Sequence, residues 1–385
     1  MPTGLASTNP WSGRGNCFSP PPVRATKRPP PRRASFSNAR HERRVMKRFL
    51  IIGALVAALP APALWAQDAS DVTCMNVPEP VVSLDYGSRY TDDSKDRSDI
   101  DKASNAAVNE ALGPIDDFIV DLTGKANKAA KGGDGAEDAA ACVVDALSVW
   151  AKADALSDLQ SMNANLSSPS RFGAMALAYL QAESATEVDP DKAKTIEDWL
   201  KARARHTAKW FDTEAPDMAS QNNLRAWAGL AAAAVGNAAG DDYLKAWANT
   251  SFALVACQAD EDGALKWEME RGPRALHYQL HAVAPLVVGA ALLQGDGYPT
   301  FDMCDGAIHR AVKFIPAAFD NLDMVAEKAG EEQTFATGDE KLKSFELAWA
   351  DAYLSLFDAP EIASFVEEYR PLSNSKLGGE QSALW

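Results

Sequence analysis

The chain has 385 residues, of which 38 are Lys or Arg and 53 are Asp or Glu, so its net charge at neutral pH is −15. Residues 1–66 hold 11 of these basic residues and one of the acidic ones, which leaves a net charge of −25 on the rest. Such an acidic body disfavours nucleic-acid binding by bulk electrostatics, which requires a basic face, so we expect no nucleic-acid partner. An anionic polymer can bind only in a local cleft where basic residues converge.

The first 66 residues have the pattern of a non-structural region that ends in a secretion signal over residues 46–66. Met46 opens a basic start, residues 49–59 are apolar, and small residues follow as a cleavage site. The apolar run is roughly a dozen residues, shorter than the ~20 that span a bilayer, which predicts no membrane anchor. We expect a periplasmic or secreted protein starting near Gln67, with residues 1–45 an upstream over-annotation, a transit peptide or a disordered arm.

Residues 67–385 are enough for one large domain or two smaller ones, and we interpret them as a single domain. Four cysteines lie in this part, and an even number after a secretion signal indicates two disulfides. Pairing in sequence order predicts Cys74–Cys142 and Cys257–Cys304. The same part has four histidines and no Cys-x-x-Cys, so we expect no metal site.

From about residue 100 the chain reads as successive helices, with apolar residues three and four apart and almost no alternating strand pattern. Asp138 is the expected N-cap of the first clear example, with Cys142, Val149 and Trp150 on its apolar face. We expect helices over residues 138–155, 171–181, 190–211, 222–235, 242–257, 273–293, 304–315 and 341–356. The fold class is therefore all-α, and a bundle, a solenoid or a closed ring of helical hairpins all fit.

Two segments place polar residues where a helix would bury apolar ones. The first is Gln221–Trp227, whose paired asparagines, Asn222 and Asn223, fit either an N-cap or a ligand contact. The second is Leu265–His281, in which Gly-Pro marks the turn into a helix. Its polar residues therefore converge: Arg271 lies at the mouth of the helix, and Arg274, Tyr278 and His281 follow along one face.

Four stretches resemble the alginate (polymannuronate) lyase family of polysaccharide lyases, possible relatives being the glucuronan (cellouronate) lyases. They are the Cys-containing helix Cys142–Ala153, the loop Gly87–Tyr90, the signature Glu270–Tyr278 and the C-terminal segment around residues 371–379. The resemblance implies an (α/α) toroid, or incomplete helical-hairpin barrel, with an extended groove. It also implies eliminative cleavage of an acidic polysaccharide with no metal and no cofactor.

Elimination requires that the proton at C5 of a uronate be removed while its carboxylate is neutralised. Arg271 and Asn223 supply the charge and the hydrogen bond for that carboxylate. The resemblance assigns Tyr278 as both the base and the acid. Because tyrosine ordinarily titrates near ~10, we expect Arg271, Arg274 or a histidine to acidify it.

The sequence departs from the family at Leu224, where a histidine usually follows the paired asparagines. We expect His277 or His281 to compensate from the other helix. Further substrate-binding residues are expected among the polar and aromatic side chains of the resembling stretches and of other helices: Asn222, Arg89, Tyr90, Arg274, Arg171, Trp227 and Lys376. The alternative for each of these side chains is ordinary packing or a position on the solvated surface.

The sequence thus predicts a monomeric, endo-acting lyase on a β-1,4-linked polyuronate, with an unsaturated uronate at each new end. Leu224 favours glucuronan over polymannuronate, sugars that differ only at C2. One alternative is a non-catalytic polyuronate-binding protein on the same fold. Another is a hydrolase, which would need two facing carboxylates, whereas Glu268 and Glu270 lie on an expected loop without a partner.

Overall fold

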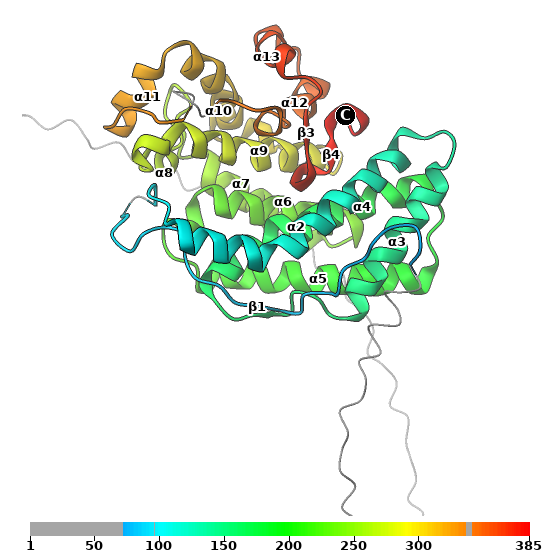
Figure 1. Cartoon of the computed structure of the whole chain (residues 1–385). Coiled ribbons are helices and arrows are strands. Elements are labelled where there is room, and N and C mark those ends of the chain that lie inside the picture. Colours follow the sequence, from blue (N-terminus) through cyan, green and yellow to red (C-terminus); the bar gives the residue numbers. More distant parts are fainter. Residues whose placement is uncertain (1–71, 96, 336–340) are drawn as a thin grey trace, which may run out of the picture. The chain divides into compact units, whose positions relative to one another are not determined.

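The computed structural model describes residues 72–95, 97–335 and 341–385 (Figure 1). These residues belong to one unit, residues 60–385. The predicted secretion signal and the expected start at Gln67 lie outside the described residues.

Helices make up most of the described chain, and only two short strand pairs accompany them. The α-helices are α2 (Lys102–Lys131), α3 (Ala136–Lys152), α4 (Met162–Ala185), α5 (Pro190–Thr213), α6 (Asn223–Ala238), α7 (Asp242–Ala256), α8 (Lys266–Met269), α9 (Ala275–Gln294), α10 (Met303–Asp320), α11 (Leu322–Ala329), α12 (Ala350–Leu356) and α13 (Pro360–Val366). The 3-10 turns are η1 (Ala219–Gln221), η2 (Gly272–Arg274), η3 (Thr300–Asp302), η4 (Ser344–Glu346), η5 (Glu367–Tyr369), η6 (Ser375–Leu377) and η7 (Gln381–Ala383). The strands are the parallel pair β1 (Ser83–Leu84) and β2 (Asp158–Leu159) and the antiparallel pair β3 (Ser373–Asn374) and β4 (Gly379–Glu380).

Seven of the eight expected helices correspond to observed ones, with shifted ends. The expectation over residues 341–356 is wrong, because η4 comes first and the α-helix begins only at Ala350. Asp138 is not the N-cap of α3, since Gly135 holds that position and Asp138 lies in the first turn. The longest helix, α2, was not among the expected ranges, and its cap is Asp101, which accepts from the Ser104 backbone nitrogen.

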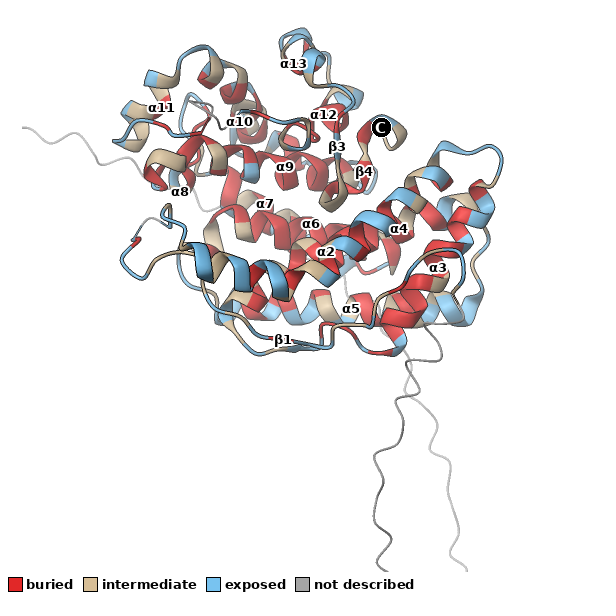
Figure 2. Ribbon diagram, in the orientation of Figure 1, coloured by how far each residue is buried: buried red, intermediate tan, exposed pale blue. Residues whose placement is uncertain are grey.

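The helices α6 and α9 form the centre of the core (Figure 2). Phe252 of α7 is fully buried between them, and each presents a glycine to its ring. A Cβ at Gly229 would lie 2.7 Å from the Phe252 ring, and one at Gly289 would lie 2.1 Å from it. Larger residues at these two positions would therefore separate the helices.

The α9 segment also explains an apolar stretch that could be mistaken for a membrane span. Residues 272–294 are long and apolar enough to cross a bilayer, with a mean hydropathy of 1.4 over the best window. Yet 83% of that window is buried within the protein, which is the pattern of a core helix.

The C-terminal segment packs against two helices from the other end of the chain. The carbonyl oxygen of Gly378 accepts from Asn127 Nδ2 of α2 at 2.7 Å and from Gln181 Nε2 of α4 at 2.9 Å. Gly378 itself has a φ of +93°, which glycine adopts without strain. These bonds fix the position of the neighbouring Lys376.

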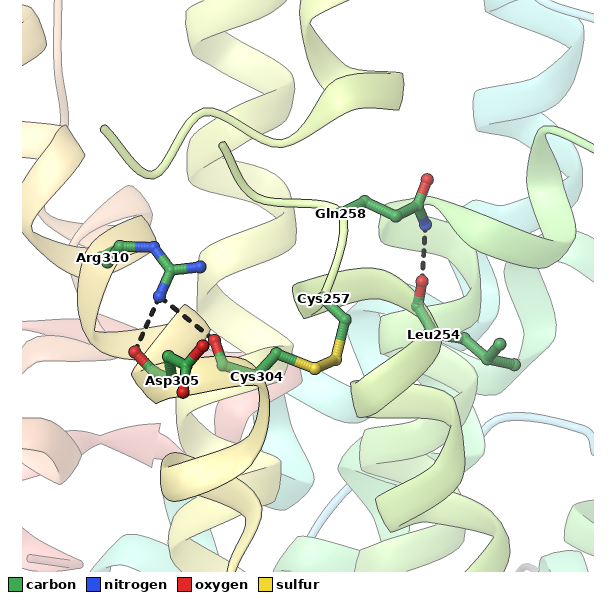
Figure 3. The surroundings of a disulfide bond; sticks show 6 residues. All are labelled: Leu254, Cys257, Gln258, Cys304, Asp305 and Arg310. Carbon is green, nitrogen blue, oxygen red and sulfur yellow. Dashed lines mark hydrogen bonds between the residues drawn. A yellow bond between two sulfur atoms is a disulfide. The ribbon is translucent and has the colours of Figure 1, made fainter. Parts of the chain in front are cut away.

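Two disulfides join distant parts of the described chain in the predicted sequence-order pairing. Cys74 of the N-terminal segment is bonded to Cys142 of α3, and Cys257 at the end of α7 is bonded to Cys304 at the start of α10 (Figure 3). Arg310 supports the second bridge by donating to the carbonyl oxygens of Cys304 and Asp305, at 3.1 and 2.7 Å. Such bridges are typical of proteins outside the reducing cytoplasm.

Candidate active site

The turn between α8 and α9 places the arginine and the tyrosine of the second polar segment. Gly272 turns the chain with a φ of +51°, and Gln333 holds the turn by donating to the Gly272 carbonyl oxygen at 2.9 Å. The helix α9 begins at Ala275, slightly later than expected. Glu268 lies in the short helix α8 and not in a loop, which corrects the expectation for that residue.

Arg271 and Tyr278 are in direct contact. The central guanidinium carbon of Arg271 lies 3.4 Å from the centroid of the Tyr278 ring, so the cation stacks on the aromatic face. Arg271 Nη2 also donates to the carbonyl oxygen of Arg97 at 2.8 Å. The Tyr278 hydroxyl is hydrogen-bonded to that of Tyr90. The N-terminal loop therefore contacts both residues of the expected catalytic pair.

The expectation that neighbouring cations acidify Tyr278 is wrong for this state of the protein. Burial raises the pKa of Tyr278, and the Tyr90 hydroxyl raises it further, whereas Arg271 and Arg274 lower it by less. Only 8% of the residue is exposed, so desolvation of the phenolate dominates. Tyr278 is therefore neutral here.

The two neighbouring asparagines have different roles: Asn222 caps a helix, and Asn223 binds a buried carboxylate. Asn222 is the N-cap of α6, because its Oδ1 accepts from the Leu224 backbone nitrogen at 3.0 Å. Asn223 instead binds Glu268 twice: its backbone nitrogen donates to Oε1 at 2.7 Å, and its Nδ2 donates to Oε2 at 2.9 Å. Leu224, at the position of the family histidine, packs partly buried against the core.

The two histidines of α9 line one face of that helix. The rings of His277 and His281 stack with centroids 6.4 Å apart, and the Trp227 ring lies 5.2 Å from His281. His281 is exposed to solvent, although protein surrounds its ring on most sides. These surroundings, followed by His277, Lys376 and Arg271, lower its pKa, so His281 is neutral at pH 7.

A second cluster of basic side chains lies around Asp116 of α2. Arg171 donates to Asp116 Oδ2 at 2.7 Å and to the Ser167 carbonyl oxygen at 2.9 Å, with its side chain only 6% exposed. Lys376 Nζ lies 3.5 Å from Asp116 Oδ1. Burial, Arg171 and Arg89 together lower the pKa of Lys376, so the three cations are close neighbours. Both Lys376 and Arg271 lower the pKa of His281. The basic cluster around Asp116 is therefore continuous with the residues around Tyr278.

The structure brings together most of the expected site residues. Around Tyr278 lie Tyr90, Arg271, Arg274, His277 and His281, with Trp227 behind them. Arg171 and Asn222 are engaged in bonds within the protein. The sequence suggested Glu268 only as half of a hydrolytic pair, yet it is fully buried while Glu270 is exposed. This placement gives the hydrolase alternative no support.

The chain is similar in sequence to enzymes that cleave acidic polysaccharides. Residues 129–323 match the family described as alginate lyase. A polysaccharide lyase of Stenotrophomonas maltophilia is 30% identical over 256 residues, which cover 66% of this chain and 75% of that one. An alginate lyase of Pseudomonas syringae pv. syringae is 27% identical over 321 residues, covering 81% and 83% of the two chains.

Solved structures share the arrangement of helices. The crystal structure of alginate lyase A1-III from Sphingomonas species A1 superposes with a TM-score of 0.66 at 23% identity, covering 82% of this chain and 86% of that one. A histidine-to-alanine variant of A1-III, complexed with a tetrasaccharide, gives a TM-score of 0.69 at 24% identity, covering 85% and 88%. The predicted (α/α)-toroid fold is thereby confirmed.

Proposed function

Because the chain belongs to the alginate lyase family and is therefore a polysaccharide lyase, a carbon–oxygen lyase, we propose that it cleaves a β-1,4-linked polyuronate by β-elimination. The observation that carries this proposal is the stack of Arg271 on Tyr278, with the Asn223 amide bound to Glu268, three residues before Arg271. A cation and an amide donor next to a phenol are the groups that elimination from a uronate needs. The product is an unsaturated uronate at each new non-reducing end.

The proposed mechanism uses one tyrosine for two proton transfers. Tyr278 as phenolate takes the C5 proton, and the electrons of that C–H bond pass into the carboxylate to give an enolate-like intermediate. They then form the C4–C5 double bond as the C4–O bond breaks. The same hydroxyl then gives its proton to the leaving oxygen, so no net proton is consumed. Arg271 and Asn223 hold the uronate carboxylate and stabilise the enolate-like intermediate.

The resting protonation state of Tyr278 suits the second of these transfers. Burial keeps the phenol neutral, as a proton donor must be. For the first transfer, the group that stabilises the phenolate is Arg271, whose charge lies over the ring. Loss of the hydrogen bond between Tyr278 and Tyr90 when substrate enters would remove one of the contacts that favour the neutral form of Tyr278.

We propose that the neighbouring cations bind carboxylates of flanking sugars. Arg89 and Lys376 are partly exposed, and among the described residues no side-chain ion pair holds Arg89. Arg171 acts less directly, because Asp116 and Ser167 engage its guanidinium. Trp227, Tyr90 and Arg274 are proposed contacts of the sugar at the cleavage point, and Asn222 caps α6, the helix that carries Trp227.

Leu224 underlies our proposal that glucuronan is preferred to polymannuronate. A leucine can neither neutralise a carboxylate nor accept a proton, so these tasks fall to Arg271, Tyr278 and the histidines of α9. His277 and His281 both lie beside Tyr278 on that helix. The two disulfides agree with a place outside the cytoplasm, and we propose a periplasmic or secreted monomer.

One assay tests the proposed reaction. The protein is mixed with glucuronan, polymannuronate and polyguluronate in turn, and the ultraviolet absorbance of the conjugated product is followed. We expect absorbance to rise with glucuronan and, more slowly, with polymannuronate. A rise with neither polymer, together with measurable binding, would favour the non-catalytic binding protein instead.

A further inference from the structure

Glu268 is a carboxylate with no exposed surface, and both of its oxygens bind the same residue. Its Oε1 accepts from the Asn223 backbone nitrogen at 2.7 Å, and its Oε2 accepts from Asn223 Nδ2 at 2.9 Å. Removing a carboxylate from water costs several kcal/mol unless donors compensate it, so a fully buried one must be held by such bonds. Two donors from one residue make a cyclic clamp between α8 and α6.

This clamp determines how the Asn223 amide is oriented. When ionised, the form that the charge of Arg271 favours, Glu268 only accepts hydrogen bonds, so the amide nitrogen and not the amide oxygen must face it. In the flipped orientation Oδ1 would oppose a carboxylate oxygen, two acceptors in contact where water cannot intervene. One hydrogen of Nδ2 is thus bound to Glu268, and the other hydrogen points away from it.

Glu268 is also linked to the second residue proposed to bind the uronate carboxylate. Arg271 follows it by three residues, and the Arg271 backbone nitrogen donates to the Glu268 carbonyl oxygen at 3.1 Å. The charge of Arg271 favours the ionised form of Glu268. One buried side chain therefore connects the helix that carries Asn223 with the turn that carries Arg271.

We propose that Glu268 is a positioning residue for the elimination: it holds the Asn223 amide with its free N–H toward the uronate carboxylate and does not itself touch substrate. The inference rests on the proposed function. A residue with only a structural role would change stability but leave the folded enzyme's turnover intact. A misplaced donor, in contrast, weakens an interaction that develops in the transition state, and so lowers kcat more than it raises KM.

The variant Glu268→Gln keeps the shape but presents an NH₂ group to one of the two Asn223 donors. We expect kcat on the best polyuronate to fall on the order of 10²-fold, as misplacement of a binding group costs, with KM nearly unchanged. Glu270→Gln is the matched control, because it removes the same charge from an exposed position two residues away. Its kcat should equal that of the wild type.

A double-mutant cycle with Asn223→Ala separates positioning from general damage. If Glu268 acts through Asn223, then adding Glu268→Gln to Asn223→Ala lowers kcat no further. Multiplication of the two losses in folded protein, shown by circular dichroism, overturns the inference while leaving the proposed function intact. Absence of elimination by the wild type on every polyuronate overturns both.

If Glu268→Gln does not fold, Glu268→Asp replaces it in the same cycle. Aspartate keeps the charge but is shorter by one methylene, so it cannot reach both donors of Asn223 in the present geometry. We expect a reduced kcat in this variant as well. A folded Glu268→Asp protein with wild-type kcat would show that the clamp does not position the amide.

Discussion

The guanidinium of Arg271 stacks on the ring of Tyr278, with 3.4 Å between its central carbon and the ring centroid. This contact brings a permanent positive charge beside a phenol that burial otherwise keeps neutral. The same arginine reaches the carbonyl oxygen of Arg97, so it also connects the N-terminal loop to the site.

Arg271→Ala should lower kcat/KM by about 10²- to 10³-fold, because both the substrate carboxylate and the Tyr278 phenolate lose their cation. Arg205→Ala is the control, since its side chain is half exposed and pairs with Asp241, the N-cap of α7. Initial rates of unsaturated-product formation provide the measurement. A folded Arg271→Ala enzyme with the rate of the control would exclude this arginine from the reaction.

Tyr278→Phe removes only a hydroxyl, so the fold should persist while the rate falls. Loss of a general acid or base typically costs ~10²–10⁴ in rate, and here one group serves both transfers, which favours the upper end. Tyr179→Phe is the matched control, because that tyrosine is also buried but bonds to Glu197 in another part of the protein. If the Tyr278→Phe enzyme keeps its rate, the base must be sought at His277 or His281.

Leu224→His restores the residue type that the family usually has after the paired asparagines. We expect activity to persist and the ratio of rates on polymannuronate and glucuronan to shift toward polymannuronate. The added imidazole would lie at the start of α6, next to the Asn223 amide. An unchanged ratio would show that Leu224 does not determine the preference.

The pH dependence of stability should report the buried state of Glu268. Burial raises its pKa to about 7, against ~4.3 for an exposed glutamate. Between those values the folded protein retains a proton that the unfolded chain has released, so this group makes stability fall as the pH rises. Glutamine does not titrate, so the stability of Glu268→Gln lacks this decrease with pH. The difference between its Tm and the wild-type Tm should therefore shift in favour of the variant from about pH 5 to about pH 7.5. An equal Tm difference at both pH values would contradict the raised pKa.

Mass spectrometry of the non-reduced, exported protein should find no free thiol among its four cysteines. In the chain-entropy model, bridges that close loops of this size stabilise the fold by about 4 kcal/mol each. Reduction of the disulfides should accordingly lower the Tm. It should also weaken the hydrogen bonds that Arg310 donates to the carbonyl oxygens of Cys304 and Asp305. Two reactive thiols in the native protein would exclude the observed pairing.

Much of the fold was predictable because the apolar faces of helices such as α3 and α5 follow a single period. The helix predicted over residues 341–356 was wrong because Trp349 and its neighbours are buried on every side. Apolar residues there do not lie on one helical face, so their spacing could not show where the helix begins. In the site, the order of Arg271, Arg274 and Tyr278 along the chain was enough to predict convergence. The bond between Asn223 and Glu268 was not predictable, because it joins residues 45 positions apart, one at the start of α6 and the other in α8. The pKa of Tyr278 likewise depends on burial that spacing does not reveal.

The bonds that the Gly378 carbonyl oxygen accepts from Asn127 and Gln181 have a consequence for how the enzyme matures. They place Lys376, near the end of the described chain, close to Arg89 near its start. During synthesis and export, Arg89 leaves the ribosome or the translocation channel well before Lys376 does. The cluster of Arg89, Arg171 and Lys376 is therefore complete only once residue 376 has folded onto α2 and α4, and a fragment ending before it would lack one of these three cations.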